Sequence, residues 1–136
     1  MNKIIVAFVV FTIMFAGFRV ICSEPKDTLV RISEIEVFPQ SLEEYRAILT
    51  EEAAASMKLE KGVISIFPMS EKENPAKIRI LEIYASREAY ESHLQTPHFQ
   101  KYKTTTLKMV KSLKLIDMKA MDAETMVETF KKIEKN

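Results

Sequence analysis

EIYASREAYESHLQTPHFQKY, residues 82–102, joins the end of a predicted strand to two helical pieces. Ser86 is a good helix N-cap, because its side-chain oxygen can accept a hydrogen bond from a free backbone N–H of the first turn. The Thr-Pro pair at 96–97 caps and restarts a second piece, with proline in the first-turn position that tolerates it. The two histidines of the protein, His93 and His98, lie on either side of this break. Imidazole chemistry is therefore expected in this stretch.

Hydrophobic periodicity predicts four strands and four helical pieces. Alternating or short β-branched apolar runs indicate strands, whereas apolar residues spaced three or four apart indicate helices. The predicted strands are 29–37, 63–67, 77–84 and 112–118, and the predicted helices are 42–58, 87–94, 97–110 and 123–135. The order β-α-β-β-α-β with an extra C-terminal helix predicts a ferredoxin-like α+β fold.

Two of these elements carry detailed predictions. In 29–37 the apolar residues change phase, so we expect a bulge or bend near Ser33. In 42–58, Ser41 and Glu44 form a predicted capping box. The predicted buried stripe of this helix consists of Leu42, Tyr45, Leu49, Ala53 and Met57, and its acidic residues lie mostly outside the stripe.

The predicted strands have apolar residues on both faces, most clearly in VISIF at 63–67. Two helices can cover only one face of a four-stranded sheet. The other face would expose a large apolar area, which usually marks an interface. A two-fold homodimer that packs sheet against sheet would bury it.

Residues 1–23 are predicted to be a signal peptide or membrane-targeting segment, with a short basic start, an apolar run and a small-residue exit. An uncleaved anchor, with residues 1–22 as a membrane tether, is the alternative. The rest divides into a tether at 24–28, a domain at 29–118 and a C-terminal helical extension at 119–136. We therefore expect an exported protein, periplasmic or associated with the cell envelope.

Composition excludes several classes of protein. The formal net charge of +1 gives no electrostatic footprint for nucleic acid. Cys22 is the only cysteine, so the chain can form no internal disulfide. It stands where a lipoprotein cysteine would stand, although Arg19 and Ile21 depart from that signal. With glycine only at positions 17 and 62, a glycine-rich phosphate loop is also excluded.

Several short sequence motifs carry a resemblance to a known family, and this resemblance covers about residues 29–118. They are Glu82-Ile83-Tyr84, Glu88-Ala89, His93 and Thr96-Pro97-His98-Phe99, supported by Phe38-Pro39 and Lys61-Gly62-Val63-Ile64. With them the chain resembles the antibiotic biosynthesis monooxygenase domain family, quinol monooxygenase-like, whose fold is a dimeric α+β barrel. The resemblance implies cofactor-independent oxygenation of a quinol or anthrone-like aromatic substrate by O2. The related haem-degrading branch uses a tryptophan, which this chain lacks, so haem chemistry is disfavoured.

Cofactor-independent oxygenation needs a base, a polar anchor and apolar walls. His93 is the expected base, because histidine titrates near physiological pH, and His98 is the second candidate catalytic residue. The candidate substrate-binding residues are Tyr84, Phe99, Tyr102 and Phe67, and Glu82 is expected to be a structural signature residue. Purely structural roles for both histidines and for the aromatic residues stay open.

A metal site remains a weaker reading of the same residues. His93, His98 and Glu82 have the residue types of a two-histidine-one-carboxylate iron site. Their spacing across a proline break is not diagnostic, so we expect neither metal nor cofactor. Two further functions also fit the fold, because a fold does not fix a function: a non-catalytic small-molecule-binding or stress-response barrel, and a structural dimer module.

Overall fold

The computed structural model describes residues 28–134. The predicted signal or targeting segment at 1–23, Cys22 and nearly all of the 24–28 tether lie outside the described residues. None of the described helices is both long enough and apolar enough to cross a membrane.

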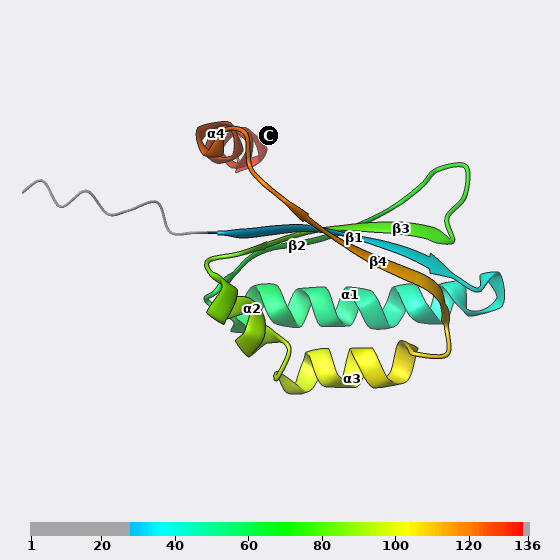
Figure 1. Ribbon diagram of the computed structural model, residues 1–136. Helices are drawn as coiled ribbons and strands as arrows, with labels where there is room; N and C mark the ends of the chain where they lie inside the picture. The colour runs from blue at the N-terminus through cyan, green and yellow to red at the C-terminus, as the bar shows by residue number, and fades with distance from the viewer. Residues whose placement is uncertain (1–27, 135–136) are drawn as a thin grey trace, which may run out of the picture.

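Four antiparallel strands form one sheet in the order β2-β3-β1-β4 (Figure 1). They are β1 (Leu29–Val37), β2 (Val63–Ser70), β3 (Lys77–Tyr84) and β4 (Val110–Met118). The first strand thus lies inside the sheet, between β3 and β4. This order, with helices between the strands, confirms the predicted ferredoxin-like α+β fold.

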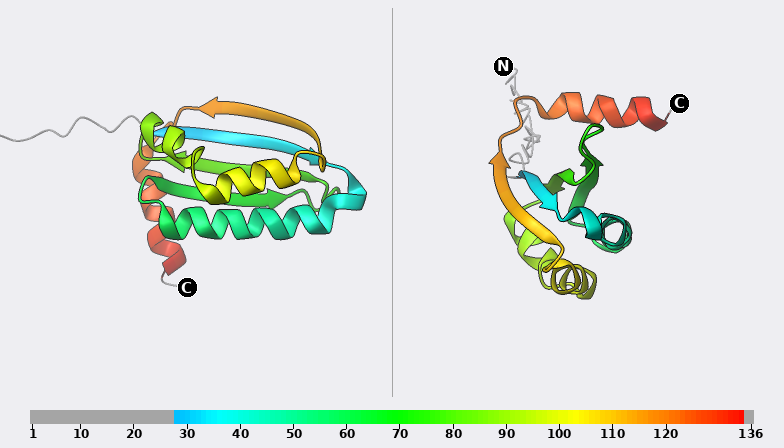
Figure 2. Two further views of the ribbon diagram at one scale, coloured as in Figure 1. Left: turned by 90° about the horizontal axis from the view of Figure 1, so that it is seen from below. Right: turned by 90° about the vertical axis from the view of Figure 1, so that its right-hand side faces the viewer.

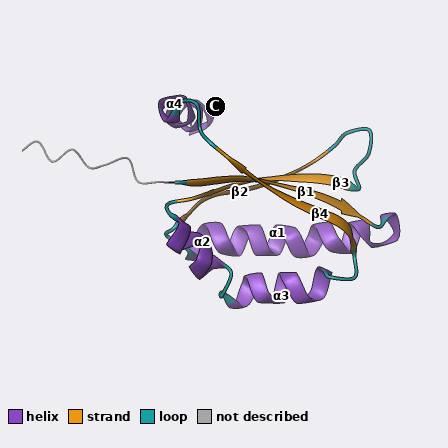
Figure 3. Ribbon diagram, viewed as in Figure 1, coloured by secondary structure: helices purple, strands orange, loops and turns teal. Residues whose placement is uncertain are grey.

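Helices lie on both sides of the sheet, but not equally. Helices α1 (Leu42–Leu59), α2 (Arg87–His93) and α3 (Pro97–Thr106) cover one face, and α1 and α3 run side by side beneath it (Figures 1 and 2). The C-terminal helix α4 (Ala123–Glu134) lies on the opposite side, beyond the end of β4 (Figure 3). A short 3-10 turn at Pro39–Ser41 connects β1 to α1.

The predicted bulge near Ser33 is wrong. Strand β1 alternates regularly, and every odd residue from Leu29 to Val37 is buried on the helix-covered face. The shift in register lies between Glu36 and Val37, in the pairing with β4. The apolar pattern changes phase because two polar residues, Arg31 and Ser33, occupy positions on the buried face.

Helix α1 buries most of the predicted stripe, with two differences. Tyr45, Leu49 and Ala53 are buried, but Met57 is 47% exposed, while Glu52 lies on the buried face. The predicted capping box does not form, since the Ser41 side chain makes no capping hydrogen bond. The 3-10 turn leaves Ser41 with a ψ of 0°, whereas an N-cap normally has an extended backbone.

Gly62 allows α2 to lie directly against the start of β2. A Cβ atom added at this glycine would stand 2.6 Å from the Cβ of Ala89, in the first turns of α2. The backbone N–H of Ala85 donates to the Gly62 carbonyl at 2.8 Å. This close approach helps to set the position of His93, the last residue of α2.

Candidate functional site

A cavity of about 610 Å³ lies between the sheet and its helical cover. Apolar side chains from both layers form much of its wall, including Ile35, Leu49, Ile66 and Ile80. Several polar groups interrupt this wall: Arg31, Ser33, Glu52, Glu82, Tyr84 and His93. A mostly apolar cavity with a few converging polar groups is the usual form of a small-molecule site.

The junction between α2 and α3 positions both histidines. Ser86 accepts a hydrogen bond from the backbone N–H of Ala89 at 3.2 Å, as its N-cap role predicts. The Thr96 hydroxyl accepts from the N–H of Phe99 at 3.3 Å and donates to the carbonyl of His93 at 2.8 Å. One side chain therefore caps α3 and holds the end of α2.

Glu60 lies between the two imidazoles. One of its oxygens, Oε1, is 2.9 Å from His93 Nδ1 and 2.6 Å from His98 Nε2. Burial alone would raise the pKa of this carboxyl, but the hydrogen bonds from His93 and His98 hold it below the ordinary value. An ionised carboxylate only accepts, so both imidazoles donate to it. In the neutral form of each ring, the lone pair is then on Nε2 of His93 and on Nδ1 of His98.

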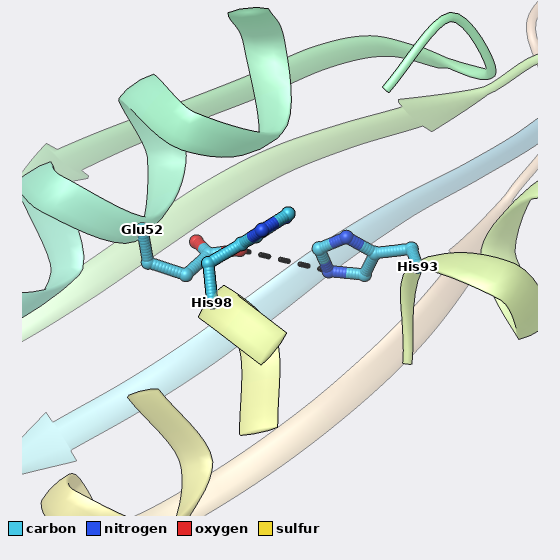
Figure 4. A group of neighbouring side chains, drawn as sticks. All are labelled: Glu52, His93 and His98. Carbon is cyan, nitrogen blue, oxygen red and sulfur yellow. Dashed lines mark ion pairs between the residues drawn. The ribbon is translucent and has the colours of Figure 1, made fainter. Parts of the chain in front are cut away.

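A second carboxylate, Glu52, lies on the cavity side of the histidines. Its Oε1 is 3.7 Å from His93 Nε2 (Figure 4) and accepts a hydrogen bond from the Ser56 hydroxyl at 2.7 Å. The side chains of His93 and Glu52 are only 3% and 4% exposed. Burial raises the pKa of the Glu52 carboxyl, and the Ser56 hydrogen bond and, in its protonated form, His93 offset this only in part.

Aromatic side chains surround the His93 ring. Phe99 lies 4.7 Å and Tyr84 5.4 Å from it, measured between ring centroids. The hydroxyls of Tyr45 and Tyr102 are 2.6 Å apart. Burial raises the pKa of Tyr45 and Tyr84, and it raises that of Tyr102 to about 12, so all three phenols are protonated at neutral pH.

The hydrogen-bond partners of Glu82 are two hydroxyl groups, whereas a metal site would place it beside the histidines. It accepts hydrogen bonds from the Ser33 hydroxyl and, at 2.8 Å, from the Tyr84 hydroxyl. The Ser33 contact joins β1 to β3, and the Tyr84 contact lies within β3, both at the wall of the cavity. The carboxylates beside the histidines are instead Glu52 and Glu60.

The structure brings most of the predicted site residues to one cavity. His93, Tyr84, Phe99, Tyr102 and Glu82 all line it, and His98 joins them through Glu60.

Phe67 does not line the cavity. It is 58% exposed and pairs with Leu81 on the other face of the sheet. The register shift between Val63 and Ser65 separates Phe67 from the inward-facing phase. The prediction of Phe67 as a pocket residue is therefore not supported.

Sequence reasoning missed three groups at the site: Arg31, Glu52 and Glu60. The Arg31 guanidinium pairs with Asp117 at 2.6 Å and lies 4.5 Å from the centroid of the Tyr90 ring. For Glu52 a signal was present in the sequence, because it lies three residues after Leu49 on the apolar stripe. Glu60 gave no such signal, because it follows the end of α1.

One group of side chains in the described part of the chain has the composition of a metal site. Glu52, His93 and His98 each offer one ligand atom, and these atoms lie within 4.8 Å of one another. They come from three different helices, α1, α2 and α3.

Comparison with known proteins places the fold in a family. The family model described as antibiotic biosynthesis monooxygenase matches residues 28–105. No curated protein matches the chain.

Solved structures agree with this match. A candidate antibiotic biosynthesis monooxygenase from Bacteroides thetaiotaomicron is 48% identical over 73% of this chain and 94% of its own, with a TM-score of 0.71. A candidate monooxygenase from Lactobacillus acidophilus is 29% identical over 68% of this chain and 44% of its own, with a TM-score of 0.66. A candidate member from Nitrosomonas europaea, 16% identical over 71% of this chain and 92% of its own, shares the fold with a TM-score of 0.67. The chain therefore belongs to the antibiotic biosynthesis monooxygenase family.

Proposed function

We propose that the protein is a cofactor-independent monooxygenase that acts on a quinol or anthrone-like aromatic substrate. The observation that carries this proposal is the position of His93. Its Nδ1 lies 2.9 Å from Glu60 Oε1, so in the neutral ring the lone pair is on Nε2, at the wall of a largely apolar cavity. A buried imidazole with one fixed tautomer is suited to act as a general base.

The reaction can be written with an anthrone, whose CH2 carbon lies opposite its carbonyl. Nε2 of His93 takes a proton from this carbon, and the carbanion adds O2 to form a peroxide anion. The peroxide regains a proton, and loss of water from it breaks the O–O bond and leaves a new carbonyl. The net change is anthrone plus O2 to anthraquinone plus water, so no external reductant is needed.

A phenol hydroxyl at the cavity can donate a hydrogen bond to the substrate oxygen on which negative charge develops. The Tyr84 hydroxyl already donates to Glu82, so its proton is not available to the substrate. Tyr45 and Tyr102 share one hydrogen bond, which leaves the pair with one proton to donate. Tyr102 lines the cavity and is therefore the better anchor for a substrate oxygen. Phe99 forms part of the apolar wall of the cavity. Closure by the aromatic side chains would keep water from the carbanion.

We also propose that the protein is exported and acts as a homodimer. Export is supported by the sequence of residues 1–23 alone. The dimer is supported by the sheet face opposite α1 and α3, where Phe67 and Met118 are 58% and 49% exposed. Light scattering of the purified protein tests the dimer, and N-terminal sequencing of protein from the cell envelope tests signal cleavage.

Oxygen consumption by metal-free protein tests the activity. With an anthrone in EDTA-containing buffer, we expect one O2 consumed per anthraquinone formed. His93→Gln should lower the rate about 10²–10⁴-fold, the usual contribution of a general base. Glu51→Gln is the matched control, because Glu51 is exposed and adjoins the buried Glu52.

Two results would change the conclusion. If His93→Gln turned over at the wild-type rate, another group would be the base. If the wild type consumed no O2 while aromatic ligands still raised its melting temperature, the protein would be a small-molecule-binding protein.

A further inference from the structure

We propose that Glu52, His93 and His98 form a binding site for one divalent first-row transition-metal ion of the Zn²⁺ or Fe²⁺ type. This goes beyond the proposed function, which uses no metal. Three ligands from three helices converge beside the cavity, and Glu52 and His93 also line it. A fourth coordination position would therefore face the space that a substrate would enter.

The ligand atoms are already close to coordinating distances. Imidazole nitrogens and carboxylate oxygens bind such ions at about 2.0–2.2 Å, so two ligands of a tetrahedral ion lie roughly 3.4 Å apart. The contact from His93 Nε2 to Glu52 Oε1 is 3.7 Å, and the three ligand atoms lie within 4.8 Å of one another. Binding would require side-chain rotations that bring the three ligand atoms closer together.

The hydrogen bonds around these residues leave one nitrogen of each ring available. Glu60 accepts from Nδ1 of His93 and from Nε2 of His98, which leaves the other nitrogen of each ring to bind an ion. A carboxylate on the far nitrogen is the common way in which proteins orient a metal-binding histidine. Ser56 fixes Glu52 in the same manner, through a hydrogen bond to Oε1.

Burial and ligand type indicate which ion would bind. A buried carboxylate needs a compensating partner, and Oε1 of Glu52 has a hydroxyl at 2.7 Å and an imidazole at 3.7 Å. Two imidazoles and one carboxylate suit zinc, iron, cobalt and copper, whereas Mg²⁺ and Ca²⁺ prefer sites made of oxygen atoms. The site should therefore discriminate against the hard ions.

An ion at this site would use the lone pair that the proposed oxygenation needs. Metal binding and base catalysis by His93 thus exclude each other in one molecule. We expect Zn²⁺ to inhibit oxygen consumption, with EDTA restoring it.

Cobalt titration tests the site without any substrate. Tag-free, full-length protein is freed of metal with EDTA, dialysed and titrated with Co²⁺, and the visible d–d absorption is recorded. We expect saturation at one equivalent per chain, bleaching by one equivalent of Zn²⁺, and a higher melting temperature with Zn²⁺ but not with Mg²⁺. Glu60→Gln should weaken binding about 10–100-fold, as loss of such an outer partner usually does.

Variants of the ligands separate this site from adventitious binding. Glu52→Gln keeps the shape of the side chain, and His98→Gln replaces the ring by a neutral polar chain. Both should lose the one-equivalent signal, whereas Glu51→Gln should keep it. Circular dichroism establishes that each variant is folded. A cobalt signal that survives in all the ligand variants, or the absence of any saturable signal in the wild type, would overturn the proposal. Neither result affects oxygen consumption in EDTA, so the two proposals can fail independently.

Discussion

Replacing Gly62 by alanine should destabilise the protein through one identifiable contact. The added Cβ would stand 2.6 Å from the Cβ of Ala89, whereas carbon atoms in contact are normally about 3.5–4.0 Å apart. The start of β2 and helix α2 must therefore separate by about 1 Å. Overpacking of this kind costs about 1–3 kcal/mol. For a domain of about 100 residues, each kcal/mol lowers the melting temperature by roughly 4–8 °C.

A double-mutant cycle shows whether this contact is the cause. Ala89→Gly alone removes the opposing Cβ and costs about 1 kcal/mol, because glycine disfavours a helix. In the double variant the new Cβ meets only the Cα of residue 89, at an ordinary distance of 3.5 Å. We therefore expect the double variant to be about as stable as Ala89→Gly, with a coupling energy of about 1–3 kcal/mol. Unfolding in urea, followed by circular dichroism, measures all four proteins. If the two costs simply added, the steric explanation would be refuted.

Three further predictions concern the core, a helix cap and alkaline pH. Leu49→Ala should lower the free energy of unfolding by about 2–5 kcal/mol in urea titrations, because Leu49 is 3% exposed; a loss below 1 kcal/mol would contradict the packing described. Ser86→Ala should cost about 0.5–2 kcal/mol in the same assay, and Ser86→Asp should retain most of the cap. Burial raises the pKa of Tyr45, Tyr84 and Tyr102, so the folded protein holds their protons more tightly than the unfolded chain, in which tyrosine titrates near pH 10. Stability should be unaffected by these groups below that pH and should fall above it. Their tyrosinate absorbance should rise together with the loss of circular dichroism, and ionisation in a still-folded protein would contradict their burial.

The sequence predicts best those parts of the fold that depend only on residues close together in the chain. Strand β3 has its predicted bounds, because its run rich in apolar and β-branched residues ends two residues before the helix N-cap Ser86. The caps at Ser86 and Thr96 form as expected, since each needs only a hydroxyl and the N–H three residues later.

The site was predicted less completely, because its polar residues occupy positions where the pattern calls for apolar ones. The apolar phase change predicts a bulge or bend near Ser33, although Arg31 and Ser33 are regular strand residues that face the cavity. Glu52 belongs to the acidic residues that are predicted to lie mostly outside the buried stripe, yet it is buried. Functional sites often place polar residues at positions where the hydrophobic pattern of the fold would have apolar ones. Periodicity alone therefore misplaces these polar residues.

The break between α2 and α3 sets how His93 and His98 can be arranged. In one uninterrupted helix, residues five apart point about 140° away from each other, at about 100° per residue. The two rings would then point to different sides of the helix. Thr96 and Pro97 separate the two helices, so His93 and His98 belong to different helices. The direction of one imidazole is therefore not fixed by the direction of the other. Insertions or deletions at 94–96 are therefore a simple evolutionary route by which relatives could keep this fold and acquire a different pair of groups at the cavity wall.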